Sequence, residues 1–283
     1  MQPYQKKTLG ILLFLVNLAW GVAQVNAYVL QGPHLLELMI QNSKKSPRLL
    51  ISQKLILYHT DQKGRVEFNE TLKYVFPKSF RSDLVSEGVQ RIHVLSKGAA
   101  LTIMDGKAVA ESETLYDHYK DIILYNSRAL LEEKLSRQGV NVTVSSLGRF
   151  QGKPAYVVGA QYPDETVPQV WLDKDTFKPW RWLLKGKADK QRQDFLEVRY
   201  LDWQQLNKTW YPMRIEFYKK DILVREIKVH SVEAAPSFSE KLFDIDHLKS
   251  LYRPAITMLP DKGEKKELDE VQKTIEEFKK TYK

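Results

Sequence analysis

The strongest constraint on the fold is the alternation of apolar and polar residues from Thr209 to Val232. Two runs alternate in this way, separated by the polar turn Lys219-Lys220-Asp221. Successive side chains of a strand point to opposite faces, so the segment predicts a β-hairpin in an antiparallel sheet with one apolar and one hydrated face. The apolar face of the first run carries Tyr211, Met213, Ile215 and Phe217. Such a face either packs on a core or coats a cavity, and this choice decides the function.

A second strict alternation runs from Val66 to Phe76 and stops at Pro77, which cannot donate a ladder hydrogen bond. Its large inward side chains are those of Phe68, Leu72, Tyr74 and Phe76. In a further short run, Trp180 and Trp182 are expected to share a face with Leu184. We predict that these side chains and those of the hairpin point to the concave side of one sheet. The alternative is ordinary packing in a closed core.

Strand-like runs fill most of the chain between residues 49 and 110 and between residues 140 and 203. Between Glu113 and Gln138 the alternation stops, and apolar residues recur at spacings that predict two helices, broken near residues 125–127. A short helix is predicted to begin at Gly32-Pro33. A sheet this large must curl or stack. We therefore predict a mainly β fold with helices: a strongly curved antiparallel sheet, or incomplete β-barrel, of about 10–11 strands covered by helices.

The two ends of the chain differ in composition from the middle. Lys6 and Lys7 precede an apolar run, and small residues follow near Ala27, which predicts a secretory signal peptide over residues 1–27. An uncleaved anchor is the alternative. Residues 28–253 form the predicted domain, and residues 254–283 a polar linker with a charged C-terminal helix. The chain has no cysteine, which excludes disulfides, thiolate metal sites and attachment of a lipid through cysteine.

Motifs that would identify an enzyme or a nucleic-acid-binding protein are missing from the sequence. No GxSxG, P-loop or GxGxxG pattern occurs, and the six histidines show no metal-ligand spacing. The net charge is +9, and removal of residues 1–27 lowers it by two, but the basic residues are interspersed with acidic ones. We therefore expect no catalytic residues, no cofactor, no metal and no nucleic-acid partner.

Several short motifs occur in a distinctive order. They are Phe76-Pro77 with Phe80-Arg81, Met104-Asp105-Gly106-Lys107, Val170-Trp171-Leu172-Asp173, and Trp210-Tyr211-Pro212 through Leu242-Phe243-Asp244. In this order the chain resembles the LolA-like family of periplasmic outer-membrane lipoprotein carriers and lipoprotein-sorting proteins, over about residues 35–244. Val109-Ala110-Glu111 replaces the aromatic pair usual in that family, and the charged C-terminal tail is additional.

The resemblance implies a periplasmic, monomeric carrier whose apolar cavity holds acyl chains of a lipoprotein or another lipid. It also implies an inner-membrane transporter that loads the carrier and an outer-membrane acceptor that receives the cargo. One alternative is a sensory or structural domain of RseB-like type that works through protein contacts. Another is a hydrolase in a curled sheet. A cavity of several hundred cubic ångströms would favour the carrier, whereas a filled core would favour the protein-contact domain. A serine or histidine side chain that converges with an acid would favour the hydrolase.

Two charged residues occupy predicted inward positions between apolar neighbours. Glu70 lies between Phe68 and Leu72, and Arg225 between Leu223 and Ile227. Buried charges are rare unless paired, so we predict that Glu70 pairs with Arg225, or else with Arg81. The pair would be structural, or it would be a latch that rearranges when cargo binds. The helical segment 113–138 is predicted to cover the mouth of the sheet, as a movable lid or a permanent plug.

Overall fold

The computed structural model describes residues 29–43, 46–58, 64–77, 79–86, 88–109, 113–186, 195–206 and 209–254. The predicted signal peptide, residues 1–27, lies outside the described residues, as does the predicted C-terminal tail after residue 254.

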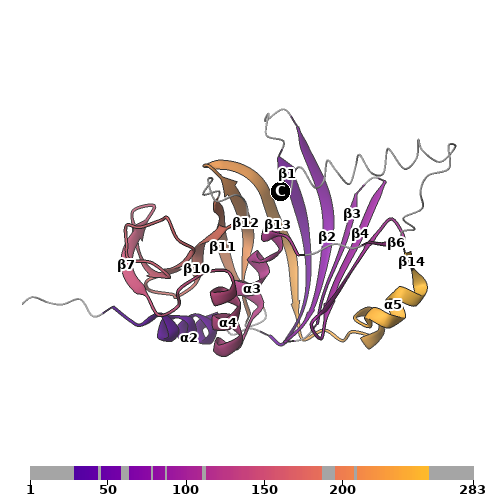
Figure 1. Ribbon diagram of the computed structural model, residues 1–283, viewed down its shortest axis with the longest axis horizontal. Coiled ribbons are helices and arrows are strands. Elements are labelled where there is room, and N and C mark those ends of the chain that lie inside the picture. Colours follow the sequence, from indigo (N-terminus) through magenta and orange to yellow (C-terminus); the bar gives the residue numbers. More distant parts are fainter. Residues whose placement is uncertain are drawn as a thin grey trace, which may run out of the picture.

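One sheet of fourteen strands dominates the fold, in the order β14-β6-β5-β4-β3-β2-β1-β13-β12-β11-β10-β9-β8-β7 (Figure 1). The strands are β1 (Arg48–Tyr58), β2 (Arg65–Val75), β3 (Ser79–Ser86), β4 (Val89–Ser96), β5 (Ala99–Met104), β6 (Lys107–Val109), β7 (Ser145–Phe150), β8 (Lys153–Val158), β9 (Gln169–Asp173), β10 (Pro179–Lys185), β11 (Phe195–Leu206), β12 (Thr209–Lys219), β13 (Ile222–Ala234) and β14 (Arg253–Pro254). The two-residue strand β14 joins β6 in parallel, and all other neighbours are antiparallel.

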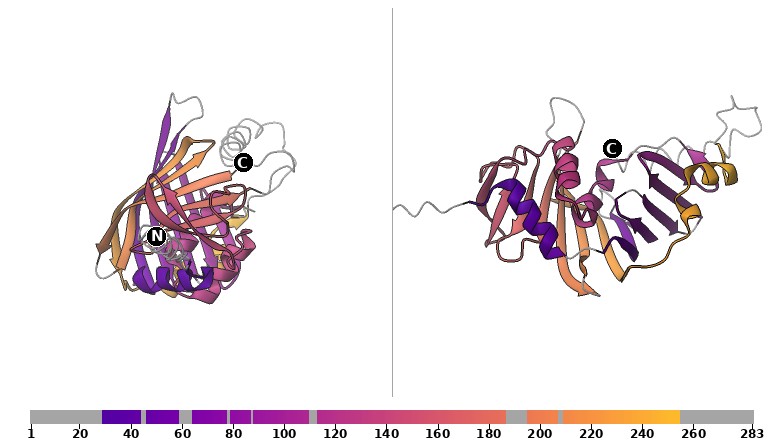
Figure 2. Two further views of the ribbon diagram at one scale, coloured as in Figure 1. Left: turned by 90° about the vertical axis from the view of Figure 1, so that its left-hand side faces the viewer. Right: turned by 90° about the horizontal axis from the view of Figure 1, so that it is seen from below.

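The predicted fold class is confirmed. The sheet is strongly curved but does not close, and β7 and β14 form its two edges (Figure 2). It has more strands than the ten or eleven expected. The predicted hairpin is β12 and β13, and the Asp105-Gly106 turn joins β5 to β6 with both residues at positive φ. Asp tolerates this conformation and Gly has no Cβ to oppose it, which explains the tight turn.

The helices are α2 (Gly32–Ser43), α3 (Tyr119–Leu124), α4 (Arg128–Arg137) and α5 (Ile245–Leu251), with 3-10 turns η1 (Leu115–Asp117) and η2 (Glu240–Leu242). The predicted break between the two helices of segment 113–138 is confirmed, because Tyr125 adopts an extended conformation after α3. Gly139, which follows α4, has a φ of 83°, the left-handed conformation that commonly ends a helix.

Helices α2, α3 and α4 pack on one face of the sheet, and α5 packs on the other. Helix α3 packs inside the curve, here called the concave face, while α2 and α4 pack on each other beside β8 and β12 (Figures 1 and 2). Helix α5 covers the convex face of β4 and β5 through Leu248, which contacts a small core that includes Val94 and Ile103. Sequence periodicity did not predict α5, because the helix has seven residues and Leu248 is its one buried residue.

Candidate functional site

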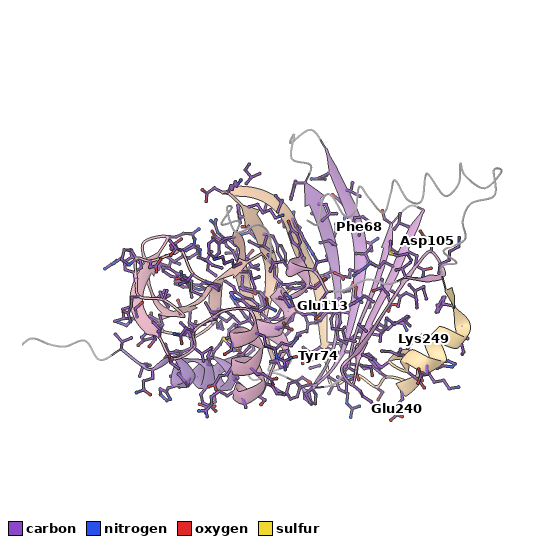
Figure 3. The ribbon with its side chains drawn as sticks, in the orientation of Figure 1. Phe68, Tyr74, Asp105, Glu113, Glu240 and Lys249 are labelled. Atoms are coloured by element: carbon purple, nitrogen blue, oxygen red, sulfur yellow. The ribbon has the colours of Figure 1, made fainter. Side chains whose placement is uncertain are left out.

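The concave face is built from side chains that the strand register aligns across the sheet. One row runs through Trp182, Val198, Phe217 and Arg225 on four adjacent strands, because each is the register partner of the next. Seven of the predicted concave residues are buried in the main core: Phe68, Leu72, Tyr74, Trp182, Tyr211, Ile215 and Phe217. Phe76 and Met213 are half-buried against the same core. Figure 3 places Phe68 and Tyr74 toward opposite ends of β2.

The prediction that Trp180 shares a face with Trp182 is wrong. Trp180 packs against a separate cluster on the convex side that contains Trp171 and Val157. The pairing of β10 with β9 shifts register between Pro179 and Arg181, so that one additional residue is inserted. Such a bulge shifts the alternation of side-chain direction by one residue, and Trp180 therefore points away from the concave face.

Helix α3 covers the concave face at close range. Its residues Tyr119, Ile122, Ile123 and Leu124 are all buried in the main core. The ring of Tyr119 meets that of Phe217 edge to face, with centroids 5.5 Å apart. These contacts show that α3 fills the concave face with side chains of its own.

Two hydrogen bonds attach Tyr119 of α3 to the sheet. The Tyr200 hydroxyl donates to the Tyr119 carbonyl oxygen at 3.0 Å, and Gln53 Nε2 donates to the Tyr119 hydroxyl at 3.3 Å. Burial raises the pKa of both tyrosines, so both hydroxyls keep their protons at neutral pH.

Between the first turn of α3 and strands β1 to β4 lies a cavity of about 30 Å³. Its polar lining includes Glu70, Ser82, His93, Lys120 and Arg225. The volume suffices for one or two water molecules and is far smaller than an acyl chain. In this conformation, therefore, α3 fills the concave face where a carrier would need space.

Glu70 is buried on this face, but its partners are not arginines. Its carboxylate accepts hydrogen bonds from Gln53 Nε2 at 2.6 Å and from the Ser82 hydroxyl at 2.5 Å. Both donors come from neighbouring strands, at inward positions between apolar residues. Sequence reasoning missed Gln53 and Ser82, although each interrupts an apolar alternation and could have been found by that signal.

Arg81 is wrong as a partner for Glu70. Its guanidinium pairs with Asp83, at 2.7 Å from Nη2 to Oδ1, and its Nη1 donates to the Leu242 carbonyl oxygen at 3.1 Å. Leu242 ends η2, the turn that leads to α5 on the convex side. Arg81 is therefore a convex-face residue that fastens the η2 segment to the sheet.

Arg225 does share the concave face with Glu70, but the two form no ion pair; both belong to the described part of the chain. The Arg225 guanidinium lies over the ring of Phe217, 4.8 Å from its centroid, and 5.7 Å from the ring centroids of Tyr116 and Tyr119. Cation–π contacts of this kind hold an arginine without a carboxylate. The predicted latch between Glu70 and Arg225 is therefore absent from this conformation.

A network of charged groups holds the segment that leads into α3. Lys120 donates to Glu113 at 2.8 Å and to the Asp117 carbonyl oxygen at 2.6 Å. Burial alone would lower the pKa of Lys120, but the neighbouring carboxylates, Glu113 foremost, outweigh it and raise the pKa. Burial acts to raise the pKa of Asp117, yet nearby cations and the Thr114 backbone N–H hold it well below its usual range. All of these groups are charged at neutral pH.

Ser82, His93 and Glu70 meet in the cavity, but they are not connected as a catalytic triad. A triad places histidine between the serine and the acid. Here Ser82 donates directly to Glu70, and His93 Nδ1 hydrogen-bonds the Thr102 hydroxyl at 2.8 Å. Burial, assisted by Arg91, lowers the pKa of His93 to about 4, so the ring is neutral and a poor base. The serine lacks the base that would activate it.

Six buried polar atoms on the concave face have no hydrogen-bond partner among the described residues. They are Gln53 Oε1, Tyr74 Oη, His93 Nε2, Trp182 Nε1, Tyr211 Oη and Arg225 Nε. Buried polar groups in protein cores usually have a hydrogen-bond partner. These six atoms make the concave face the least satisfied part of the described core.

Other kinds of site find no support in the described ranges. No cluster of three or more His, Cys, Asp or Glu side chains there could hold a metal ion. None of the helices in those ranges has the length and apolar character that crossing a bilayer requires.

No protein-family model and no curated protein sequence matches the chain. Solved structures do. A LolA superfamily protein from Nitrosomonas europaea aligns with a TM-score of 0.55 at 9% identity, over 77% of this chain and 100% of that one. A domain from Vibrio parahaemolyticus, assigned as an outer membrane lipoprotein-sorting protein, aligns with a TM-score of 0.51 at 13% identity, over 77% and 98%.

A DUF1329 family protein from Desulfovibrio piger aligns with a TM-score of 0.50 at 13% identity, over 77% of this chain and 97% of that one. At these identities the likeness is one of fold alone. The chain has a LolA-like fold, as its motifs predicted.

Proposed function

We propose that the protein is a carrier that binds acyl chains of a lipoprotein or another lipid between the concave face and α3. One observation carries the proposal: short helices, rather than a second sheet, cover the apolar inside of the curved sheet, and the six-residue helix α3 lies on it between strands and helices alike. A short helix that follows a 3-10 turn and ends at an extended residue can leave its site at lower cost than a sheet layer can. The likeness to a lipoprotein-sorting domain supports the same ligand class.

The energetics of exchanging α3 for an acyl chain are close to balanced. Burying an apolar side chain stabilises by about 1.5–3 kcal/mol, so withdrawing the four buried side chains of α3, those of Tyr119, Ile122, Ile123 and Leu124, costs about 6–12 kcal/mol. Burying roughly twelve methylenes of an acyl chain contributes about 10 kcal/mol at about 0.8 kcal/mol each. An exchange this close to balance allows both loading and release, which a carrier requires.

The cellular setting of this proposal rests on the sequence. A signal peptide over residues 1–27, cleaved near Ala27, would deliver the domain to the periplasm as a monomer without catalytic activity. Cargo would arrive from an inner-membrane transporter and leave for an outer-membrane acceptor that binds it more tightly.

A second candidate function has one observation in its favour. The cavity of about 30 Å³ means that the concave face is filled in this conformation, which suits a domain that works through protein contacts. In that case α3 would be a permanent plug, and the convex face or the sheet edges would do the binding.

The experiment that separates the two candidates holds α3 in place. Phe76, after β2, and Tyr125, after α3, have ring centroids 6.0 Å apart. Because the chain has no cysteine, Phe76→Cys/Tyr125→Cys can be bridged by a short, cleavable bismaleimide without side reactions. Uptake of a radiolabelled lipopeptide from detergent should be blocked in the bridged protein and should return after cleavage.

Each single cysteine variant, capped with a monofunctional maleimide, controls for loss of the aromatic ring. Unchanged uptake by the bridged protein would remove the lid role of α3. Absence of acyl ligands both in uptake assays and in mass spectra of lipids extracted from the purified protein would remove the carrier function and favour the protein-contact candidate.

A further inference from the structure

One end of the concave face carries a row of apolar side chains, here called the rim row. It consists of Leu57 on β1, Val66 and Phe68 on β2, and Val89 on β4. Leu57 and Val66 are register partners, and Phe68 and Val89 belong to the main core or pack against it. Figure 3 shows Phe68 at the end of β2 that lies away from Tyr74. The rim row therefore extends the apolar lining to the end of the sheet where β2 begins.

The described contacts of α3 with the middle of the sheet lie short of this row. Tyr119 receives a hydrogen bond from Gln53, whose register partner on β2 is Glu70. Val66 lies four residues beyond Glu70, about 13 Å along the strand at about 3.3 Å per residue. Phe68 is nevertheless only 6% exposed, and a side chain this buried typically touches about 6–12 residues, more than its sheet neighbours supply. This burial indicates that a further segment of the chain lies across the row.

The C-terminal residues 255–283, which lie outside the described residues, have the sequence pattern that such a segment needs. Their apolar residues recur at intervals of three and four, which predicts a helix with one narrow apolar stripe: Leu268, Val271, Ile275, Phe278 and Tyr282. A helix of about 15 residues is marginal in water on its own, so it needs a surface that buries its stripe. Residues 255–283 contain seven acidic residues and seven lysines, so apolar contact rather than net charge would hold them there.

This C-terminal segment begins beside the rim row. Arg253 of β14 pairs with the first residue of β6, directly after the turn at Asp105. Asp105 accepts a hydrogen bond from the Gln90 backbone N–H and donates its own N–H to the Gln90 carbonyl oxygen, next to Val89. Figure 3 shows Asp105 and Phe68 toward the same end of the sheet. The chain therefore leaves the described structure at the level of the row.

The lengths of the segment fit the width of the sheet at this end. Strands β14 and β4 are three spacings apart, about 14 Å at about 4.8 Å each, and residues 255–267 can span up to about 43 Å. From Leu268 to Tyr282 a helix would be about 21 Å long at about 1.5 Å per residue. The four spacings from β4 to β13 amount to about 19 Å. The stripe is thus about as long as the part of the sheet that carries the rim row.

We propose that residues 255–283 of this chain dock across the rim row, with the stripe of the predicted C-terminal helix on Val66, Phe68 and Val89. The segment then closes the end of the concave face that lies beyond α3. The proposal goes beyond the carrier function, because docking needs no ligand. Where the carrier function holds, a ligand that enters from this end has to displace the segment, which makes it a competitor built into the chain.

The test forms disulfides in the full-length chain, which has no cysteine of its own. Val66→Cys is combined in turn with Val271→Cys, Ile275→Cys and Phe278→Cys, and each protein is oxidised with copper phenanthroline. At least one pair should form an intramolecular disulfide, seen as a faster-migrating monomer on a non-reducing gel. Val66 is 38% exposed and the other substitutions lie in the C-terminal segment, so none of them opens the main core.

Two control pairs separate docking from chance collision. Val85→Cys with Ile275→Cys is the matched control, because Val85 lies at the same end of the sheet and is 47% exposed. It follows Leu84, which lines the concave cavity, so Val85 points to the convex face. Val66→Cys with Lys273→Cys is the second control, because Lys273 lies opposite the stripe on the predicted helix. Both control pairs should form little disulfide.

Substitutions in the stripe show whether its apolar side chains hold the segment in place. Ile275→Asp and Phe278→Asp, added to the Val66→Cys/Val271→Cys pair, remove two buried apolar side chains. Their loss should weaken docking by more than about 100-fold, so the disulfide yield should fall to that of the controls. Lys273→Asp and Lys280→Asp, on the outward side of the predicted helix, should leave the yield unchanged.

The outcomes that would overturn the proposal are distinct. Yields no higher than those of the two control pairs at all three stripe positions would exclude docking across the rim row. Disulfide-linked dimers whose yield rises with protein concentration would assign the row to the C-terminal segment of a second copy and overturn docking within one chain. Neither result bears on the carrier function, which depends on the uptake of ligand.

Discussion

Substitution of Tyr200 by phenylalanine should lower the stability of the protein and at the same time tighten its binding of acyl ligand. Tyr200 is fully buried, and its hydroxyl donates to the Tyr119 carbonyl oxygen at 3.0 Å. Removing the hydroxyl takes away a hydrogen bond between the sheet and α3 without emptying the core of its ring. The prediction follows because that bond exists only while α3 is in place.

The expected magnitude follows from one buried hydrogen bond, which contributes about 1 kcal/mol. The free energy of unfolding should therefore fall by about 1 kcal/mol, and the melting temperature by about 2–4 °C for a domain of this size. When α3 is displaced, water can satisfy the Tyr119 carbonyl, so the open state bears no penalty. A ligand that binds only the open state should gain the same free energy, which is about fivefold in apparent affinity.

Stability is to be measured by urea denaturation and affinity by titration with an acyl lipid. Tyr58→Phe is the matched control: it also loses a hydroxyl that makes a hydrogen bond, but on the convex face, and should leave affinity unchanged. If Tyr200→Phe is less stable but binds with unchanged affinity, α3 is a fixed plug. If affinity weakens together with stability, ligand binding uses the closed arrangement and the reasoning is refuted.

Three further predictions concern other parts of the molecule. In a double-mutant cycle of Glu70→Gln with Arg225→Met, the coupling in unfolding free energy should stay below about 0.5 kcal/mol, because no ion pair joins the two; a coupling of about 3 kcal/mol would restore the latch. His93 has an ordinary unfolded pKa of 6.5 and a folded pKa of about 4, so the unfolded chain takes up its proton first as pH falls. The contribution of His93 to the free energy of unfolding, about 3 kcal/mol, should be present above pH 6.5 and lost progressively toward pH 4. Denaturation at several pH values should show that His93→Gln weakens this dependence of stability on pH. Gly32→Ala would place its Cβ 2.0 Å from the Val142 carbonyl oxygen, so circular dichroism melts should show a loss of more than about 1 kcal/mol, and an unchanged melt would contradict the packing of α2.

Much of the fold could be read from local patterns in the sequence. The alternation along β2 and β12 identified the inward residues, from Phe68 to Phe217, because the direction of a side chain in a regular strand depends only on its position in that strand. The break near Tyr125 was visible for the same reason, since helical spacing ends where the backbone becomes extended. Neither inference required knowledge of which strands are neighbours.

The failures arose where the result depended on neighbouring strands. Trp180 was assigned to the wrong face because the bulge in β10 is a property of its pairing with β9. Glu70 was expected to meet an arginine, yet the sheet register brings it beside Gln53 and Ser82.

The sequence by itself determined which faces of the strands are apolar, that the sheet is antiparallel and curved, and that a helical pair interrupts it. Only the tertiary structure decided the partners of Glu70 and Arg225, the depth to which α3 enters the concave face, and which polar atoms of that face have no partner in the described residues. The physical reason is that side-chain direction is fixed by backbone geometry within one strand, whereas contacts between charges depend on register and on the seating of a helix. Both of those are set by residues far apart in the chain.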